Sequence, residues 1–136
     1  MKVTTCCLLG ILINAFSGYA VALDKDLTLR FENIPYKNAE VYCENDQKIK
    51  PTTNDFELID YTAMSSDLGN RYVLATIRNK SSGQRLFNQN HIIAILGDCS
   101  RIKPLSVEQK YEGKQTITTQ LNFGVSRYPI LKVITE

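Results

Sequence analysis

The feature that most constrains this chain is a series of short strand-like runs, each ended by turn-forming residues. Residues 72–77 and 92–96 are almost wholly apolar and rich in β-branched side chains, as in central strands that are buried on both faces or lie at a sheet interface. Elsewhere apolar and polar residues alternate, as at Leu27, Leu29 and Phe31, which is the period of a strand with one buried face. The predicted strands cover residues 26–32, 39–43, 56–61, 71–78, 91–96, 105–111, 116–123 and 130–135.

The stretches between these runs have the composition of turns. Residues 79–83 and 112–114 carry Gly with Asn, Ser or Lys, and residues 44–54 form a longer polar stretch around Pro51. Residues 62–68 are the one stretch predicted to form a helical turn. Strands that recur every roughly 8–12 residues predict an all-β chain, and we expect an antiparallel β-sandwich of about seven or eight strands.

The N-terminus predicts export. Residues 1–22 carry one Lys, no acid, an apolar core and small residues at their end, which is typical of a cleaved signal peptide. Cleavage after Ala22 is the preferred expectation and cleavage after Ala20 the alternative. An uncleaved membrane anchor is disfavoured because the apolar core is shorter than the ~20 residues that span a bilayer. We therefore expect one domain over residues 23–136, with 15 Lys and Arg against 14 Asp and Glu, a net charge of +1.

Export would leave Cys43 and Cys99 as the only cysteines. In an oxidising compartment such a pair predicts one disulfide, whose loop-closure contribution to stability is roughly 4 kcal/mol. A metal pair or a redox couple is disfavoured, because the chain has no Cys-x-x-Cys spacing and only one His.

In the second half of the chain, Tyr72 to Asn79 is followed by Gly97-Asp98, Pro104-Leu105 and Gly113, and then by Leu121-Asn122-Phe123-Gly124. This order of residues resembles Ig-like domains of exported bacterial proteins. The resemblance implies an Ig-like sandwich in an exported protein, without any catalytic residue. The Trp that packs on the disulfide of antibody domains has no counterpart, because the chain contains no Trp.

No motif in the chain predicts catalysis or a cofactor. His91 is the only base for a Ser-His-Asp arrangement, and no nucleophile-elbow sequence surrounds the serines. Carboxylate pairs occur at Glu57 with Asp60 and at Glu108 with Glu112, as they do by chance in many small domains. Residues 44–46 lack the Gly and the later Glu of a calcium loop. We expect no metal, no cofactor and no enzymatic activity.

Basic and aromatic residues in predicted loops are the remaining candidates for binding. The near-zero net charge disfavours nucleic acid. Solvated loops are the ordinary interpretation of the basic residues, and core or strand-edge packing is that of the aromatic residues. Lys48 with Lys50 form one further basic group, and Tyr42 and Tyr111 also lie beside polar turns. The candidate binding residues are Tyr36, Lys80, Arg85, Arg101, Lys103 and Tyr128.

These features together favour an exported binding or accessory module, periplasmic or secreted, without a membrane span after cleavage. Its partner would be another exported or envelope protein, or an anionic glycan that meets the positive loops. The alternative is a structural subunit or chaperone-like component of a surface fibre or secretion assembly, which would bind through an exposed strand edge. A carboxylate-dependent hydrolase is a remote third expectation.

Overall fold

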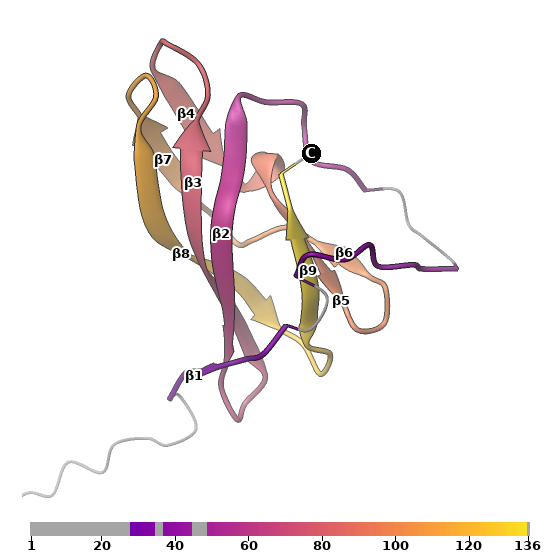
Figure 1. Cartoon of the computed structure of the whole chain (residues 1–136). Coiled ribbons are helices and arrows are strands. Elements are labelled where there is room, and N and C mark those ends of the chain that lie inside the picture. The colour runs from indigo at the N-terminus through magenta and orange to yellow at the C-terminus, as the bar shows by residue number, and fades with distance from the viewer. Residues whose placement is uncertain (1–27, 35–36, 45–48, 136) are drawn as a thin grey trace, which may run out of the picture.

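The computed structural model describes residues 28–34, 37–44 and 49–135. The signal-peptide prediction, both cleavage sites and Tyr36 lie outside these residues. Within them the chain is all-β and its strands pair antiparallel (Figure 1). The nine strands are β1 (Arg30–Phe31), β2 (Phe56–Ser65), β3 (Asn70–Asn79), β4 (Arg85–Asn88), β5 (Ile93–Leu96), β6 (Arg101–Ile102), β7 (Glu108–Tyr111), β8 (Thr116–Val125) and β9 (Ile130–Ile134).

The first sheet has the strand order β1-β2-β3-β8. Its central strand β3 buries Val73, Ala75 and Ile77 on one face and turns Thr76 and Arg78 to the other, because side chains alternate along a strand. A central strand at residues 71–78 is therefore confirmed, with one buried face at the interface between the sheets and not two.

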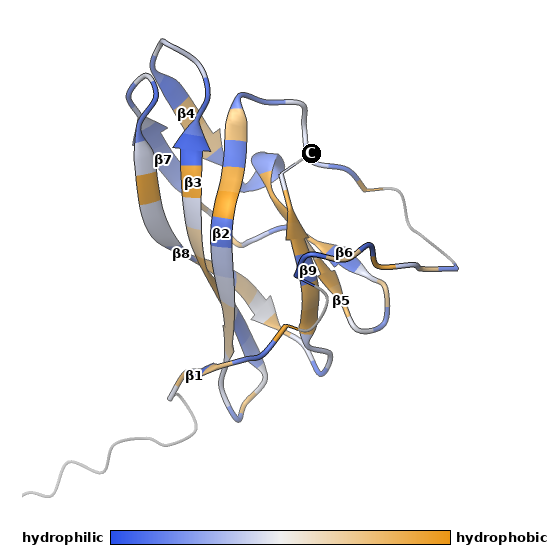
Figure 2. Cartoon of the chain, viewed as in Figure 1, coloured by the Kyte–Doolittle hydropathy of each residue, from blue (hydrophilic) through white to orange (hydrophobic). Residues whose placement is uncertain are grey.

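The second group of strands faces the buried side of the first sheet. It consists of a β4-β7 pair and a three-stranded sheet in the order β6-β5-β9. All four residues of β5 are buried, and Figure 2 shows β5 and β9 largely in orange. The prediction of a central strand within residues 91–96 is confirmed for Ile93–Leu96.

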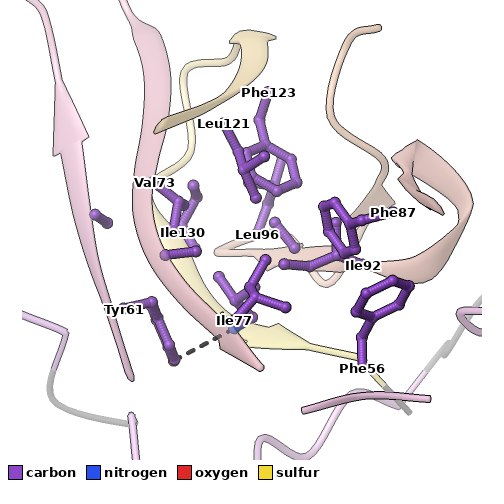
Figure 3. Packing of buried hydrophobic residues seen from close by; sticks show 14 of the residues in the cluster. Phe56, Tyr61, Val73, Ile77, Phe87, Ile92, Leu96, Leu121, Phe123 and Ile130 are labelled. Atoms are coloured by element: carbon purple, nitrogen blue, oxygen red, sulfur yellow. Dashed lines mark hydrogen bonds between the residues drawn. The ribbon is translucent and has the colours of Figure 1, made fainter. Parts of the chain in front are cut away.

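The core lies between these two sets of strands, as expected of a sandwich. Val73, Ile77 and Leu121 from the first sheet meet Phe87 and Leu96 from the second group (Figure 3). The two sets are also joined by one hydrogen bond, which the Val133 amide donates to the Tyr61 hydroxyl at 3.3 Å (Figure 3).

The predictions for the N-terminal part of the chain are wrong in two places. Residues 39–43 show the alternation of a strand but form none, because no strand lies beside their backbone to pair with it. The predicted half-buried strand at residues 26–32 is reduced, within the described residues, to Arg30 and Phe31. Phe31 is 74% exposed, because β1 pairs at the margin of the sheet, beyond the core.

The other errors concern lengths and short elements. Residues 62–65 extend β2 instead of coiling, because each finds a partner on β3, and Gly69 at φ +80° completes the turn that follows. His91 ends a 3-10 turn, Gln89–His91, whose N-cap is Asn88. The short strands β4 and β6 lack the apolar alternation that would have predicted them.

The predicted disulfide between Cys43 and Cys99 is confirmed. Cys43 lies in a segment without regular structure, and not in a strand as expected, whereas Cys99 lies in the turn after β5. The bond ties residues 37–44 to the second group of strands. In the part of the chain that the structure describes, no helix is long and apolar enough to cross a membrane.

Candidate interaction edge

The two lateral sides of the sandwich differ in how their border strands are covered. On the β2 and β9 side, residues 28–34 and 37–44 run alongside the strands (Figure 1). The Glu32 amide donates to the Ala63 carbonyl of β2 at 2.8 Å, and the Lys132 ammonium of β9 donates to the Ala39 carbonyl at 2.8 Å. We call this the covered side.

A buried ion pair reinforces the covered side. The Arg71 guanidinium lies 2.7 Å from the Glu32 carboxylate, and the two side chains are only 10% and 22% exposed. The Arg71 Nε also donates to the Ser126 carbonyl at 3.0 Å. Nearer the surface, Lys37 forms an ion pair with Asp60 and lies over the Tyr61 ring.

The other side of the first sheet ends at β8, a ten-residue strand with β3 as its only ladder partner in the described sheets. The Asn79 amide donates to the Gln115 carbonyl just before β8 begins. This bond fixes which β8 residues direct their backbone N–H and C=O groups toward β3. Ile117 and Thr119 bond toward β3, because hydrogen-bonded pairs alternate along an antiparallel ladder. The backbone groups of Thr116, Thr118 and Gln120 therefore point away from the sheet.

These outward groups are unpaired within residues 28–34, 37–44 and 49–135. The one backbone hydrogen bond that reaches the outer side of β8 comes from the Leu105 amide to the Asn122 carbonyl, at 2.7 Å. This hydrogen bond ends the open stretch toward the C-terminal end of β8. Gly124 lies there with φ of +79°, beside an irregularity in the β3–β8 register. The open stretch is residues 116–120, which we call the β8 edge.

The β8 edge lacks the charged residues that usually protect a border strand. No residue of β8 is charged, whereas the border strands β1, β6, β7 and β9 each contain Arg, Lys or Glu. On its solvent face the Thr118 hydroxyl lies 2.9 Å from the Thr76 hydroxyl of β3. A neutral edge rich in β-branched residues, with free donors and acceptors, is suited to adding one more strand.

The predicted basic residues lie in two separate regions. Lys80 and Arg85 flank the β3–β4 turn, and the Arg85 Nε donates to the Asp55 carboxylate at 2.7 Å. Lys80 shares a hollow of about 480 Å³ with Lys50 and Asn54. Because the charge of Arg85 is already paired, this region offers less positive potential than the sequence implies.

The second basic pair lies at and just after β6. The Arg101 guanidinium donates to the Ile49 carbonyl at 3.1 Å, and the Lys103 ammonium donates to the Asn90 side chain at 2.9 Å. Both interactions hold loops against the second group of strands.

The exposed aromatic candidates both lie next to Gly97, since Tyr42 lines a hollow with it and a side chain at Gly97 would meet the Tyr128 Cβ at 3.7 Å. Tyr128 is partly exposed in the β8–β9 loop, and Tyr42 is exposed beside the disulfide. Tyr111 does not lie at the surface, because its ring is fully buried against Phe56 and Phe87, as the interpretation of core packing expects. Burial raises the pKa of Tyr111 to about 12.

The residues considered for catalysis are engaged in structural contacts. His91 Nδ1 accepts a hydrogen bond from the Asn88 amide, and burial lowers the pKa of His91. The hydrogen bond from Lys37 lowers the pKa of Asp60 and favours its ionised form. The Glu57 carboxylate lies 3.8 Å from the Arg78 guanidinium. Glu112 accepts from the Gln84 side chain at 2.6 Å.

Sequence reasoning placed a strand at residues 116–123 but did not identify it as a binding element. The charge-free composition of β8 was visible in the sequence, and that is the signal that points to it. Which strand forms the border of a sheet is decided by topology. Comparison of the chain with known protein families, curated proteins and solved structures finds no match.

Proposed function

We propose that this chain is an exported, non-enzymatic binding or accessory module that binds another exported or envelope protein by adding a strand to the β8 edge. The observation that carries the proposal is the open, uncharged backbone of Thr116, Thr118 and Gln120. Main-chain hydrogen bonds supply affinity in this binding mode, and alternate side chains supply specificity.

The disulfide supports the location. Disulfides persist in oxidising compartments and are rare in the cytosol, so the Cys43–Cys99 bond is typical of a protein outside the cytoplasm. The signal-peptide pattern at residues 1–22 agrees with periplasmic or secreted placement.

A matched pair of substitutions at Thr118 tests the function. Thr118→Pro removes an amide that points to solvent, whereas Thr118→Val keeps that amide and the β-branched shape. The exported fraction of the native host is cross-linked to the wild type and to both variants, and the cross-linked residues are mapped by mass spectrometry. We expect cross-links to β8 with the wild type and with Thr118→Val, and their loss with Thr118→Pro. Cross-links that survive Thr118→Pro, or that map to Lys80, Arg85 and Arg101, would refute binding through this edge.

The β8 edge also favours the second candidate, a structural subunit of a surface fibre. A fibre needs a head-to-tail contact in which the surface that meets β8 is a different one. Sedimentation at increasing concentration separates the two, because only a fibre subunit gives species that keep growing.

A further inference from the structure

We infer that the strand added to the β8 edge is β8 of a second copy, antiparallel, with a two-fold axis at Thr118. The inference rests on the proposed function, because it takes the exported protein that binds the β8 edge to be a second copy of this chain. Two five-residue edges would then join the first sheets of the two copies into one continuous sheet.

The backbone parity of β8 fixes the register. Thr116, Thr118 and Gln120 each turn both their N–H and C=O outward, so antiparallel pairing brings these residues opposite one another. Thr118 would pair with Thr118 of the second copy, and Thr116 with Gln120 of the second copy. This register gives about six main-chain hydrogen bonds.

The side chains on the solvent face fit the same arrangement. Thr76 and Thr118 already form a hydroxyl pair across the β3–β8 ladder, and the two-fold places a second Thr118 beside the first. Cross-strand Thr–Thr pairs stabilise antiparallel sheets. No charge on β8 meets its own copy, which removes the repulsion that opposes most symmetric edge contacts.

The neighbouring borders do not offer this symmetry. On the same side of the sandwich β7 exposes Glu108 and Lys110, and on the covered side the Val133 amide of β9 is taken by the Tyr61 hydroxyl. The Leu105 amide on Asn122 stops longer pairing. A five-residue contact is smaller than a standard interface of about 1,600 Å², so the dimer is a weak and reversible one.

Single cysteines test the register, since the native cysteines are bonded to each other. Opposed residues of a hydrogen-bonded pair lie about 5.5 Å apart at Cα, within the range that a disulfide spans. We expect Thr118→Cys to form a covalent dimer under mild oxidation. Thr116→Cys and Gln120→Cys should stay monomeric when alone and cross-link when mixed with each other.

Sedimentation equilibrium up to millimolar concentration gives the second measurement. We expect the wild type and Thr118→Val to approach twice the monomer mass, and Thr118→Pro to associate at least about tenfold more weakly. Far-UV circular dichroism confirms that each variant is folded. Cross-linking of Thr116→Cys alone, or equal association of Thr118→Pro and wild type, overturns the two-fold at Thr118.

The outcome also separates this inference from the proposed function. A wild type that stays monomeric at every concentration, while its cross-links to another exported protein are lost in Thr118→Pro, overturns the second copy and leaves the edge as the binding element. Association and cross-links that both persist in Thr118→Pro overturn the inference and the function together.

Discussion

The covered side and the β8 edge lie at opposite borders of the same four-stranded sheet. The first is covered by other segments of the chain and the second is open. On the covered side residues 28–34 and 37–44 add a disulfide, an ion pair with Arg71, a backbone hydrogen bond to β2 and a hydrogen bond from the Lys132 side chain of β9. At the β8 edge one hydrogen bond from Leu105 is the corresponding contact among the described residues. Stability is thus concentrated on one side, and unused hydrogen-bonding capacity on the other.

The difference indicates a division of roles within one small sandwich. A border strand without charge or cover is a hazard for aggregation, and natural proteins usually protect it. The covered side shows that this chain has such protection where Lys37, Glu32 and Lys132 meet the strands. Its omission at β8 is the reason to assign binding there.

The largest expected effect is that of opening the disulfide on the covered side. Cys99→Ser should lower the free energy of unfolding by about 4 kcal/mol, because the bond closes a loop with a sequence separation of 56 residues. Denaturant unfolding measures the loss, and Cys43→Ser should give the same value. Amide exchange should accelerate in residues 37–44 and not along the β3–β8 ladder; an unchanged unfolding midpoint would contradict the role of the bond.

The next effect compares two ion pairs of the first sheet. Arg71→Met should cost about 3 kcal/mol, because it leaves the partly buried Glu32 carboxylate without its partner. Arg78→Met is the matched control, since Arg78 lies beside β8 in a half-exposed pair with Glu57 and should cost less than about 1 kcal/mol. Equal losses in thermal or denaturant unfolding would show that the two sides do not differ in this way.

Proline substitutions at adjacent β8 residues give the third test. Thr119→Pro should cost about 2 kcal/mol or more, because it removes an amide bonded to β3 and leaves the Ala75 carbonyl without its donor. Thr118→Pro should cost less than about 1 kcal/mol, because its amide points outward. Denaturant unfolding of the two variants decides the point, and the reverse order would mean that the inferred parity of β8 is wrong.

The smallest effect concerns Tyr111, on β7 next to the open side. Its buried hydroxyl finds no hydrogen-bond partner in residues 28–34, 37–44 and 49–135, so Tyr111→Phe should raise stability by about 1 kcal/mol. The pKa of Tyr111, raised to about 12 by burial, adds a pH signature. The wild type should lose stability as pH rises from about 10 to about 12, because only the unfolded chain ionises there. Thermal melts that show this alkaline loss in Tyr111→Phe as well would assign it to another group.

The strands that sequence patterns predicted well are those with a strong pattern and a buried face. β3 and β5 were predicted because apolar β-branched runs of that length favour strands, and β8 because Ile117, Leu121 and Phe123 alternate with polar residues. Residues 39–43 were wrongly predicted as a strand because alternation of apolar and polar residues does not show whether a neighbouring strand is present to pair with them. The pairing of Arg85 with Asp55 and the burial of Tyr111 depend on residues distant in the chain, so local composition could not reveal them.

The sequence by itself determined an all-β chain of short strands joined by turns, and it determined which two cysteines form the disulfide. It also determined that β8 has no charge, which is a property of composition alone. Only the tertiary structure decided that β8 is a border strand, that the opposite border of its sheet is covered by residues 28–34 and 37–44, and which backbone groups point outward. The physical reason is that strand order and ladder parity arise from contacts between distant segments, which no local pattern of side chains encodes.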